Sequence, residues 1–306
     1  MRVCEQSYCK GVAFIVASAF GFALMGMFVR LADDYGAPLP AIQKSFFRNL
    51  VALVIAVAMV ARRLDGLNKP PNQQTIKPHI KPISLLLLRS IFGTIGIFGN
   101  FYALSHLPVA DALMLNKLSP FFAVFFSWLF LRERITLRQT LCLIGALAGA
   151  ALVIKPGFGA TSLFPAICGL VGGLGAGIAY TCLRELGLMN VNGAFIVLFF
   201  SAFSTLASLP FMVFDYHPMT ATQLLILCGA GAAAALGQFT VTAAYRYAEA
   251  RRIAVWDYTN ILFGAILGFF AFGQVPDSLG VAGFVLILAM AFTINRRHEQ
   301  AKRYHN

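Results

Sequence analysis

Four ionisable side chains interrupt long apolar stretches of this sequence: Arg48, Arg89, Lys117 and Asp257. Guanidinium and ammonium groups bind carboxylates and phosphates, whereas a carboxylate binds amines or carries a proton. In apolar surroundings each such charge is costly unless it has a partner. We therefore take these four residues as candidates for ligand binding.

Two of the cations also have a structural explanation. Arg48 lies roughly 12 Å into its apolar stretch if that stretch is helical, where it either binds or gates a ligand or pairs with a neighbouring carbonyl or carboxylate. Arg89 lies one to two helical turns from the start of its apolar stretch. Its side chain either faces the interior of the protein or extends back toward the nearer end of the stretch. Lys44, one turn before Arg48, is expected to snorkel and act as an anchor.

A second polar group surrounds Pro120. Asn116, Lys117 and Ser119 come directly before this proline, near the middle of an apolar stretch. Because proline lacks a backbone donor, a carbonyl one turn earlier, near Asn116, is left free. Lipid tolerates free backbone only where protein or water satisfies it. We expect these residues to line a cavity, and the alternative is a simple proline kink.

A third polar group, made of Trp256, Asp257 and Tyr258, begins a later apolar stretch. The Asp257 carboxylate either complements a helix dipole, pairs with an arginine, binds a substrate amine or couples protons. Tyr180 and Gln238 are expected to add hydrogen bonds from two further stretches. Ten residues are thus predicted to bind substrate: Arg48, Arg89, Asn116, Lys117, Ser119, Tyr180, Gln238, Trp256, Asp257 and Tyr258.

Patterns typical of catalysis are absent from the sequence. It has no HExxH, no GxSxG and no ATP-binding GxxxxGK[ST] loop, and its five histidines are scattered singly. Asp33-Asp34 is the only paired carboxylate, and no third acid follows it at 35–38. We therefore expect no catalytic residues, no metal site and no cofactor. A membrane-embedded enzyme remains the alternative from a different class.

The amino-acid composition indicates that the protein folds in a lipid bilayer rather than in water. Of 306 residues, 59% are hydrophobic and 12% are charged, whereas a soluble domain has about 25% charged residues. A soluble globule of this size has too much surface to hide so many apolar side chains. The sequence thus predicts an all-α integral membrane protein.

Ten apolar segments approach the roughly 20 residues that cross a bilayer core as a helix. They cover residues 11–31, 40–61, 84–105, 108–131, 135–154, 162–184, 192–214, 221–245, 252–272 and 278–295. Turn residues such as Gly36-Ala37-Pro38 and Lys155-Pro156-Gly157 separate neighbouring segments. The sequence therefore predicts ten transmembrane helices.

Lysines and arginines are divided unevenly between the two sides of this topology. With the N-terminus inside, the inner loops and tails hold 18 of the 24, the outer side holds two, and four lie within spans. Because cytoplasmic loops are enriched in these residues, we expect both termini in the cytoplasm and the chain in the cell (inner) membrane. The net charge of +12 is then a topology signal, so the expected contacts are membrane lipids and not nucleic acid.

The two halves of the sequence resemble each other. Segments 104–133 and 245–274 are each a long apolar helix followed by a short turn and one last helix. The period is five helices, and an odd number of spans turns the second copy upside down in the membrane. We expect two inverted repeats, residues 1–157 with helices one to five and residues 158–306 with helices six to ten and a basic cytoplasmic tail.

Short motifs in this order resemble the EamA-type carriers of the drug/metabolite transporter superfamily. They are Phe47-Arg48-Asn49, Phe101-Tyr102-Ala103-Leu104, Leu118-Ser119-Pro120-Phe121-Phe122, Leu131-Arg132-Glu133-Arg134 and Phe272-Gly273-Gln274-Val275-Pro276-Asp277. The resemblance covers essentially the whole chain as two five-helix units. It implies a secondary carrier for small metabolites such as amino acids, purines, nucleotide sugars or S-adenosylmethionine.

The sequence therefore predicts a secondary active transporter that works by alternating access around a site between the two repeats. Among the six ionisable groups placed in spans, four cations outnumber the two acids, Asp111 and Asp257, which favours an anionic or zwitterionic small-molecule substrate. A channel and a lipid flippase are further alternatives. The sequence leaves open whether the protein forms a homodimer.

Overall fold

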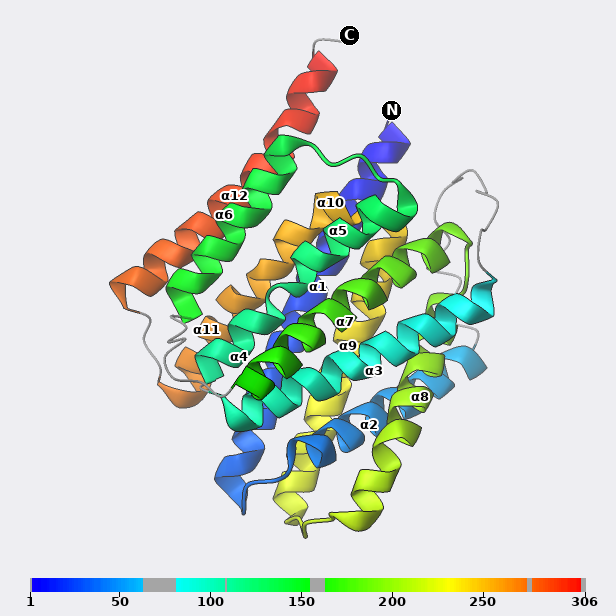
Figure 1. Ribbon diagram of the computed structural model, residues 1–306, viewed down its shortest axis with the longest axis vertical. Helices are drawn as coiled ribbons and strands as arrows, with labels where there is room; N and C mark the ends of the chain where they lie inside the picture. The colour runs from blue at the N-terminus through cyan, green and yellow to red at the C-terminus, as the bar shows by residue number, and fades with distance from the viewer. Residues whose placement is uncertain (1, 63–80, 108, 155–162, 274–276, 304–306) are drawn as a thin grey trace.

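The computed structural model describes residues 2–62, 81–107, 109–154, 163–273 and 277–303, and these ranges contain helices and connecting turns but no strands (Figure 1). The main helices are α1 (Arg2–Leu31), α2 (Ala41–Ala61), α3 (Pro82–His106), α4 (Val109–Asn116), α5 (Ser119–Leu131), α6 (Leu137–Ile154), α7 (Leu163–Leu188), α8 (Gly193–Phe214), α9 (Ala221–Tyr247), α10 (Ala250–Ile253), α11 (Thr259–Phe272) and α12 (Ser278–Arg303). Two 3₁₀ turns, η1 (Ala32–Tyr35) and η3 (Ala254–Tyr258), complete the described elements. The predicted all-α class is confirmed for this part of the chain.

Many helices in the described residues have the length and composition needed to span a membrane. Nine helical segments there are long and apolar enough to cross a bilayer, with α4 and α5 sharing one and α10, η3 and α11 sharing another. The tenth predicted segment lies in α12, whose apolar part, Ser278–Thr293, is shorter than the others. The protein is an integral membrane protein with many apolar helices.

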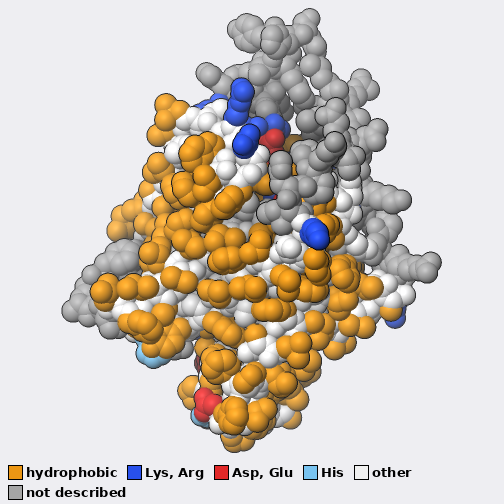
Figure 2. Space-filling model, turned by 45° about the vertical axis from the view of Figure 1, so that its right-hand side comes forward, with side chains coloured by type: hydrophobic (Ala, Val, Ile, Leu, Met, Phe, Trp, Pro, Cys, Tyr) orange, Lys and Arg blue, Asp and Glu red, His pale blue; other side chains and the backbone are white. Residues whose placement is uncertain are grey.

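The outer surface agrees with a lipid solvent. Figure 2 shows hydrophobic side chains over most of one face, with Lys and Arg gathered toward one end. Large apolar side chains that are half exposed or more include Phe130, Leu206, Val213, Phe214 and Phe270. Both chain termini lie at the same end of the bundle in Figure 1, which we call the terminal end.

Two of the predicted spans are interrupted rather than continuous. Between α4 and α5 the helix breaks at Lys117 and Leu118, directly before Pro120, as a missing backbone donor requires. The span predicted at 252–272 consists of α10, η3 and α11 and contains no proline. There the hydroxyl of Thr259 donates to the carbonyl of Trp256 at 2.7 Å and so satisfies a backbone group at the break.

The two interrupted spans also end alike. The residue after α5 is Arg132, with φ 54°, and the residue after α11 is Gly273, with φ 64°. A left-handed residue after the last turn is a common helix terminator, and glycine adopts it without steric cost. Each interrupted span is thus a broken helix followed by the same kind of stop.

Glycines bring the main helix pairs into close contact. Figure 1 shows α3 beside α7, and a Cβ added to Gly99 of α3 would lie 2.5 Å from the carbonyl oxygen of Cys168 on α7. A Cβ on Gly21 of α1 would lie 2.8 Å from the backbone nitrogen of Gly237 on α9. The absence of a side chain at Gly99 and at Gly21 therefore lets these backbones approach closely.

Candidate functional site

The breaks in the two interrupted spans meet inside the bundle. The Nζ of Lys117 donates to the Oδ1 of Asn260 at 2.7 Å, and the hydroxyl of Tyr258 donates to the carbonyl of Lys117 at 2.8 Å. The Nδ2 of Asn260 in turn donates to the carbonyl of Ala19 on α1 at 2.9 Å. Free backbone at one break is thus satisfied by a side chain from the other, which holds the two breaks together.

Asp257 lies in η3, at the second break. Its side chain is buried, and within the described chain it makes no hydrogen bond or ion pair. The charged and titratable groups in electrostatic range are Lys117, Tyr180, Tyr245 and Tyr258. Of the four roles predicted for Asp257, pairing with an arginine finds no support among the described contacts.

The two predicted arginines are buried on neighbouring helices. Arg48 of α2 is 5% exposed and Arg89 of α3 is 3% exposed. The Nη2 of Arg89 donates to the Oε1 of Gln238 on α9 at 2.9 Å, and its guanidinium carbon lies 3.9 Å from the ring centroid of Phe200. Arg89 therefore faces the interior and does not snorkel, because Gln238 supplies an acceptor and Phe200 an aromatic face there.

Tyr180 of α7 connects the arginines to the breaks. Its ring stacks on that of Tyr245, with centroids 5.2 Å apart. It lies in electrostatic range of Arg48, Arg89 and Asp257. The structure thus brings seven of the ten predicted residues together as one region, which we call the central site: Arg48, Arg89, Lys117, Tyr180, Gln238, Asp257 and Tyr258.

The other three predicted residues lie beside this region. Ser119 is buried at the start of α5, and Asn116 is half-buried at the end of α4. The ring of Trp256 packs edge-on against Phe292 of α12, with centroids 5.6 Å apart. Asn260 was not among the ten residues predicted for the site, although it is the hydrogen-bond partner of Lys117. A search for polar residues one turn after the second break would have found it.

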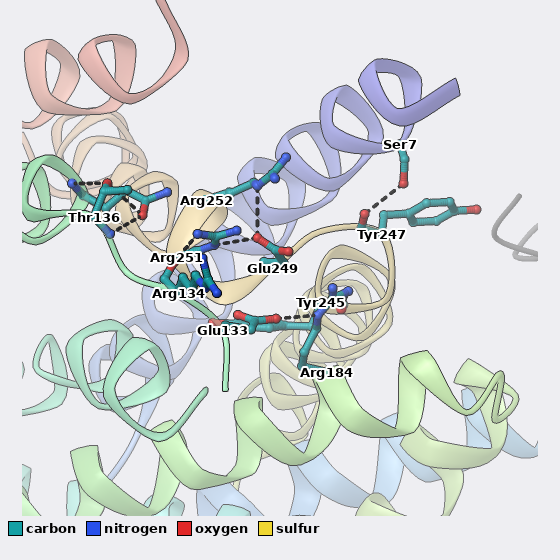
Figure 3. A network of polar contacts seen from close by, with 11 residues as sticks. Ser7, Glu133, Arg134, Thr136, Arg184, Tyr245, Tyr247, Glu249, Arg251 and Arg252 are labelled. Carbon is teal, nitrogen blue, oxygen red and sulfur yellow. Dashed lines mark hydrogen bonds and ion pairs between the residues drawn. The ribbon is translucent and has the colours of Figure 1, made fainter. Parts of the chain in front are cut away.

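At the terminal end a buried ion pair joins two helices (Figure 3). The Nε of Arg184, near the end of α7, lies 3.0 Å from the Oε1 of Glu133, just after α5, and both side chains are less than a tenth exposed. The Nη1 of Arg184 also donates to the carbonyl of Tyr245 on α9 at 3.2 Å. Arg184 is one of the 18 cations that the sequence assigned to the inner loops and tails. The structure places it at the terminal end but buries it against Glu133 rather than leaving it exposed in a loop.

A second acid lies close to this pair. Glu249 accepts from the Nε of Arg251 at 2.6 Å and from the Nε of Arg252 at 3.1 Å, and Arg251 also donates to the carbonyl of Arg134. Burial raises the pKa of Glu133 despite the charge of Arg184. Burial acts in the same direction on Glu249, but the hydrogen bond from Arg251 and the nearby arginine charges outweigh it and lower its pKa.

The opposite end is held by other contacts. The Nζ of Lys44 lies 2.6 Å from the Oδ2 of Asp33, so Lys44 is buried in an ion pair rather than extended as the expected anchor. Gln43 exchanges two hydrogen bonds with the backbone of His217, at 2.7 and 3.0 Å. Gln223 of α9 donates to two carbonyls around η1. The connections α1–α2 and α8–α9 are therefore tied together.

No group of three His, Cys, Asp or Glu side chains suited to a metal occurs in the ranges that the structure describes. The side chains of the central site offer hydrogen bonds and charges. Cationic groups are the most numerous kind, beside one carboxylate, one amide and two tyrosines. Such a set can hold and release a polar solute.

Comparison with known proteins gives consistent matches. The sequence matches the model of the EamA-like transporter family over residues 9–155. It is 31% identical over 289 residues to the pseudopaline exporter CntI of Pseudomonas aeruginosa, covering 94% of this chain and 96% of that protein. It is 25% identical over 308 residues to a riboflavin transporter of Vibrio cholerae, covering 97% of each. A mouse protein, solute carrier family 35 member G1, is 24% identical over 95% of this chain and 81% of its own length.

A solved crystal structure shares the fold. It superposes with a TM-score of 0.71 at 18% sequence identity, and the match covers 90% of this chain and 95% of that one. At this level of identity the likeness concerns the fold alone.

Proposed function

Because the chain belongs to the EamA-like transporter family, we propose that it is a secondary active carrier that moves a small anionic or zwitterionic metabolite by alternating access. The family resemblance predicted from the sequence is confirmed by these comparisons, and the relatives named above are transporters rather than enzymes. The full sequence has no ATP-binding loop, which favours a secondary mechanism.

The single observation that carries the proposal is the meeting of two broken helices around charged side chains. Carriers with repeated halves bind substrate near the bilayer midplane, where discontinuous helices expose backbone and polar groups. Here the breaks at Lys117 and at η3 contact each other through Tyr258 and Asn260. Buried charges that remain in a bilayer despite their cost usually mark a solute pathway.

The inverted-repeat arrangement, with halves at 1–157 and 158–306, is part of the proposal. Helix α1 packs against α9 and α11, and α7 packs against α3 and α5. If each helix is replaced by the one five spans away along the chain, the contacts of α1 with α9 and α11 become the contacts of α7 with α3 and α5. The left-handed stops after α5 and α11 match in the same way. This correspondence supports two copies related by a two-fold axis.

The proposed topology has ten crossings, with α12 as the tenth, and both termini in the cytoplasm of a cell whose inner membrane holds the protein. Support comes from the shared position of the termini in Figure 1 and from the cationic side chains at one end in Figure 2. An even number of crossings is required by termini on one side. Reporter fusions to the N- and C-terminus test this, and a reporter signal from outside the cell at either end overturns it.

The substrate panel for a first experiment follows from the relatives and the charges. Purified protein in proteoliposomes is offered amino acids, nucleotides, di- and tricarboxylates, riboflavin and pseudopaline, the last two because related proteins are named for them. We expect saturable uptake or release of at least one anionic or zwitterionic compound, absent from protein-free liposomes. If cationic or neutral compounds alone are moved, the proposed substrate class is wrong.

A further inference from the structure

We propose that Arg48 and Arg89 form an anion subsite that binds a carboxylate or phosphate of the transported solute. This inference rests on the proposed function for its biological meaning. The binding site itself is argued from contacts alone and is measurable without transport.

Among the residues that the structure describes, the buried guanidinium of Arg48 has no partner. Arg48 is 5% exposed, and within the described chain it makes no hydrogen bond and no ion pair. Its Nε is sealed from the surface, whereas its terminal nitrogens are not. A guanidinium has five donors, and a buried donor without a partner, such as this Nε, is costly. The terminal nitrogens are placed to bind a ligand. A buried arginine that served packing alone would have its donors satisfied.

Arg89 is a second guanidinium in electrostatic range of the first, and it is held in place. Gln238 accepts from its Nη2 at 2.9 Å, and Phe200 lies beneath its guanidinium. Its Nε has no partner either among the described residues. Neither Gln238 nor Phe200 has a negative charge, so the structure orients this cation without neutralising it.

No acid among the described residues is an electrostatic partner of the two arginines. The carboxylate of Asp257 is in electrostatic range of Lys117. The electrostatic neighbours of Arg48 are instead Tyr180 and Arg89, and those of Arg89 are Tyr180 and Cys182. Two like charges in a low-dielectric interior repel each other strongly. An anion between them removes this repulsion and satisfies unused donors at once. Planar oxyanions fit, because guanidinium groups bind carboxylate and phosphate through paired hydrogen bonds.

Gly93 offers a way to displace Arg89 without changing any charge. A Cβ added to Gly93 would lie 2.3 Å from the Nη1 of Arg89 and 2.8 Å from the ring of Phe200. The end of an arginine side chain moves more easily than backbone, so Gly93→Ala shifts the guanidinium and preserves the helix. Gly26 is the matched control, because a Cβ there meets no atom within 4 Å.

The test measures how succinate, inorganic phosphate and, as an uncharged control, succinamide protect the purified protein from thermal unfolding. We expect succinate or phosphate to raise Tm saturably in the parent protein and succinamide to have no effect. In Arg48→Gln, Arg89→Gln and Gly93→Ala the half-saturating concentration should rise at least tenfold, whereas Gly26→Ala should match the parent. Arg48→Lys, which keeps the charge but loses the fork, should be intermediate.

Three results overturn the proposal: no response of the parent protein to either anion, an unchanged response in Arg48→Gln and Gly93→Ala, or equal losses in Gly26→Ala. A further arm repeats the titration with added phosphatidylglycerol, since a lipid headgroup has the same phosphate chemistry. If this lipid alone stabilises the protein and abolishes the response to succinate, the occupant is lipid and the proposal fails. Anion binding without any uptake in proteoliposomes would contradict the proposed function and leave this subsite standing.

Discussion

Removing one partner of the buried pair Glu133–Arg184 should have very different effects depending on which partner is removed. Burial raises the pKa of Glu133, which means that the folded protein favours the neutral form of this carboxyl more than the unfolded chain does. Glu133→Gln keeps an acceptor for the Nε of Arg184 and removes the buried negative charge. Arg184→Gln instead leaves that charge without its counterion.

The magnitudes follow from the geometry. Both side chains are less than a tenth exposed, and the pair is joined at 3.0 Å, so deleting the cation should cost about 3–5 kcal/mol, as for other buried pairs. The Oε2 of Glu133 already lacks a hydrogen-bond partner among the described residues. The free energy of unfolding of Glu133→Gln should stay within about 1 kcal/mol of that of the parent protein. Adding Glu133→Gln to Arg184→Gln should recover most of the loss.

The assay is the free energy of unfolding in mixed micelles titrated with SDS, measured for both single variants and the double variant. Arg252 and Glu249 supply the control pair, since both side chains are about a quarter exposed and the coupling there should remain below about 1 kcal/mol. A cost for Glu133→Gln as large as that for Arg184→Gln, or a double variant as unstable as the two losses combined, would refute the reasoning.

Three further outcomes are expected. Because the folded-state pKa of Glu133 is raised, the stability that this residue contributes falls as pH rises from about 4.5 through the raised value. Acidification within that window should therefore raise the Tm of the parent protein relative to that of Glu133→Gln. A Tm difference that does not change with pH would contradict this. Lys117→Ala should reduce flux in proteoliposomes at least tenfold with unchanged expression, because it removes the buried ammonium and its hydrogen bond to Asn260 across the two breaks. Undiminished flux would exclude Lys117 from the site. Gly99→Ala should cost about 1–3 kcal/mol by forcing apart the backbones of α3 and α7, whereas Gly264→Ala, which meets nothing within 4 Å, should cost little; equal Tm values for the two would show that this close contact is unimportant.

The sequence predicted best where a local chemical rule applies. Pro120 marks a break because it lacks a donor, and the structure breaks there. Turn residues and apolar length located most of the spans. The second break was missed because residues 254–258 contain neither proline nor glycine. The turn there contacts α1, α5 and α6, which lie far away in the sequence.

Long-range contacts explain the other differences. Arg184 was counted with the cations of the inner loops, and its partner Glu133 was not predicted because the fold brings the two together across 51 positions. Lys44 was expected near the headgroups, but the turn after α1 places Asp33 within 2.6 Å. The inward direction of Arg89 depends on Gln238, which lies 149 positions away. A sequence shows which residues are costly to bury, but the fold decides which partners they meet.

Counterflow tests most directly whether this chain is a carrier. Proteoliposomes are preloaded with the unlabelled solute that the substrate panel selects, and entry of the labelled solute is followed in the parent protein and in Arg48→Gln. The account predicts that preloading accelerates entry and produces a transient overshoot in the parent, and that both effects are lost in Arg48→Gln. Labelled solute that only equilibrates, at a rate independent of preloading, would contradict alternating access and identify a passive pore.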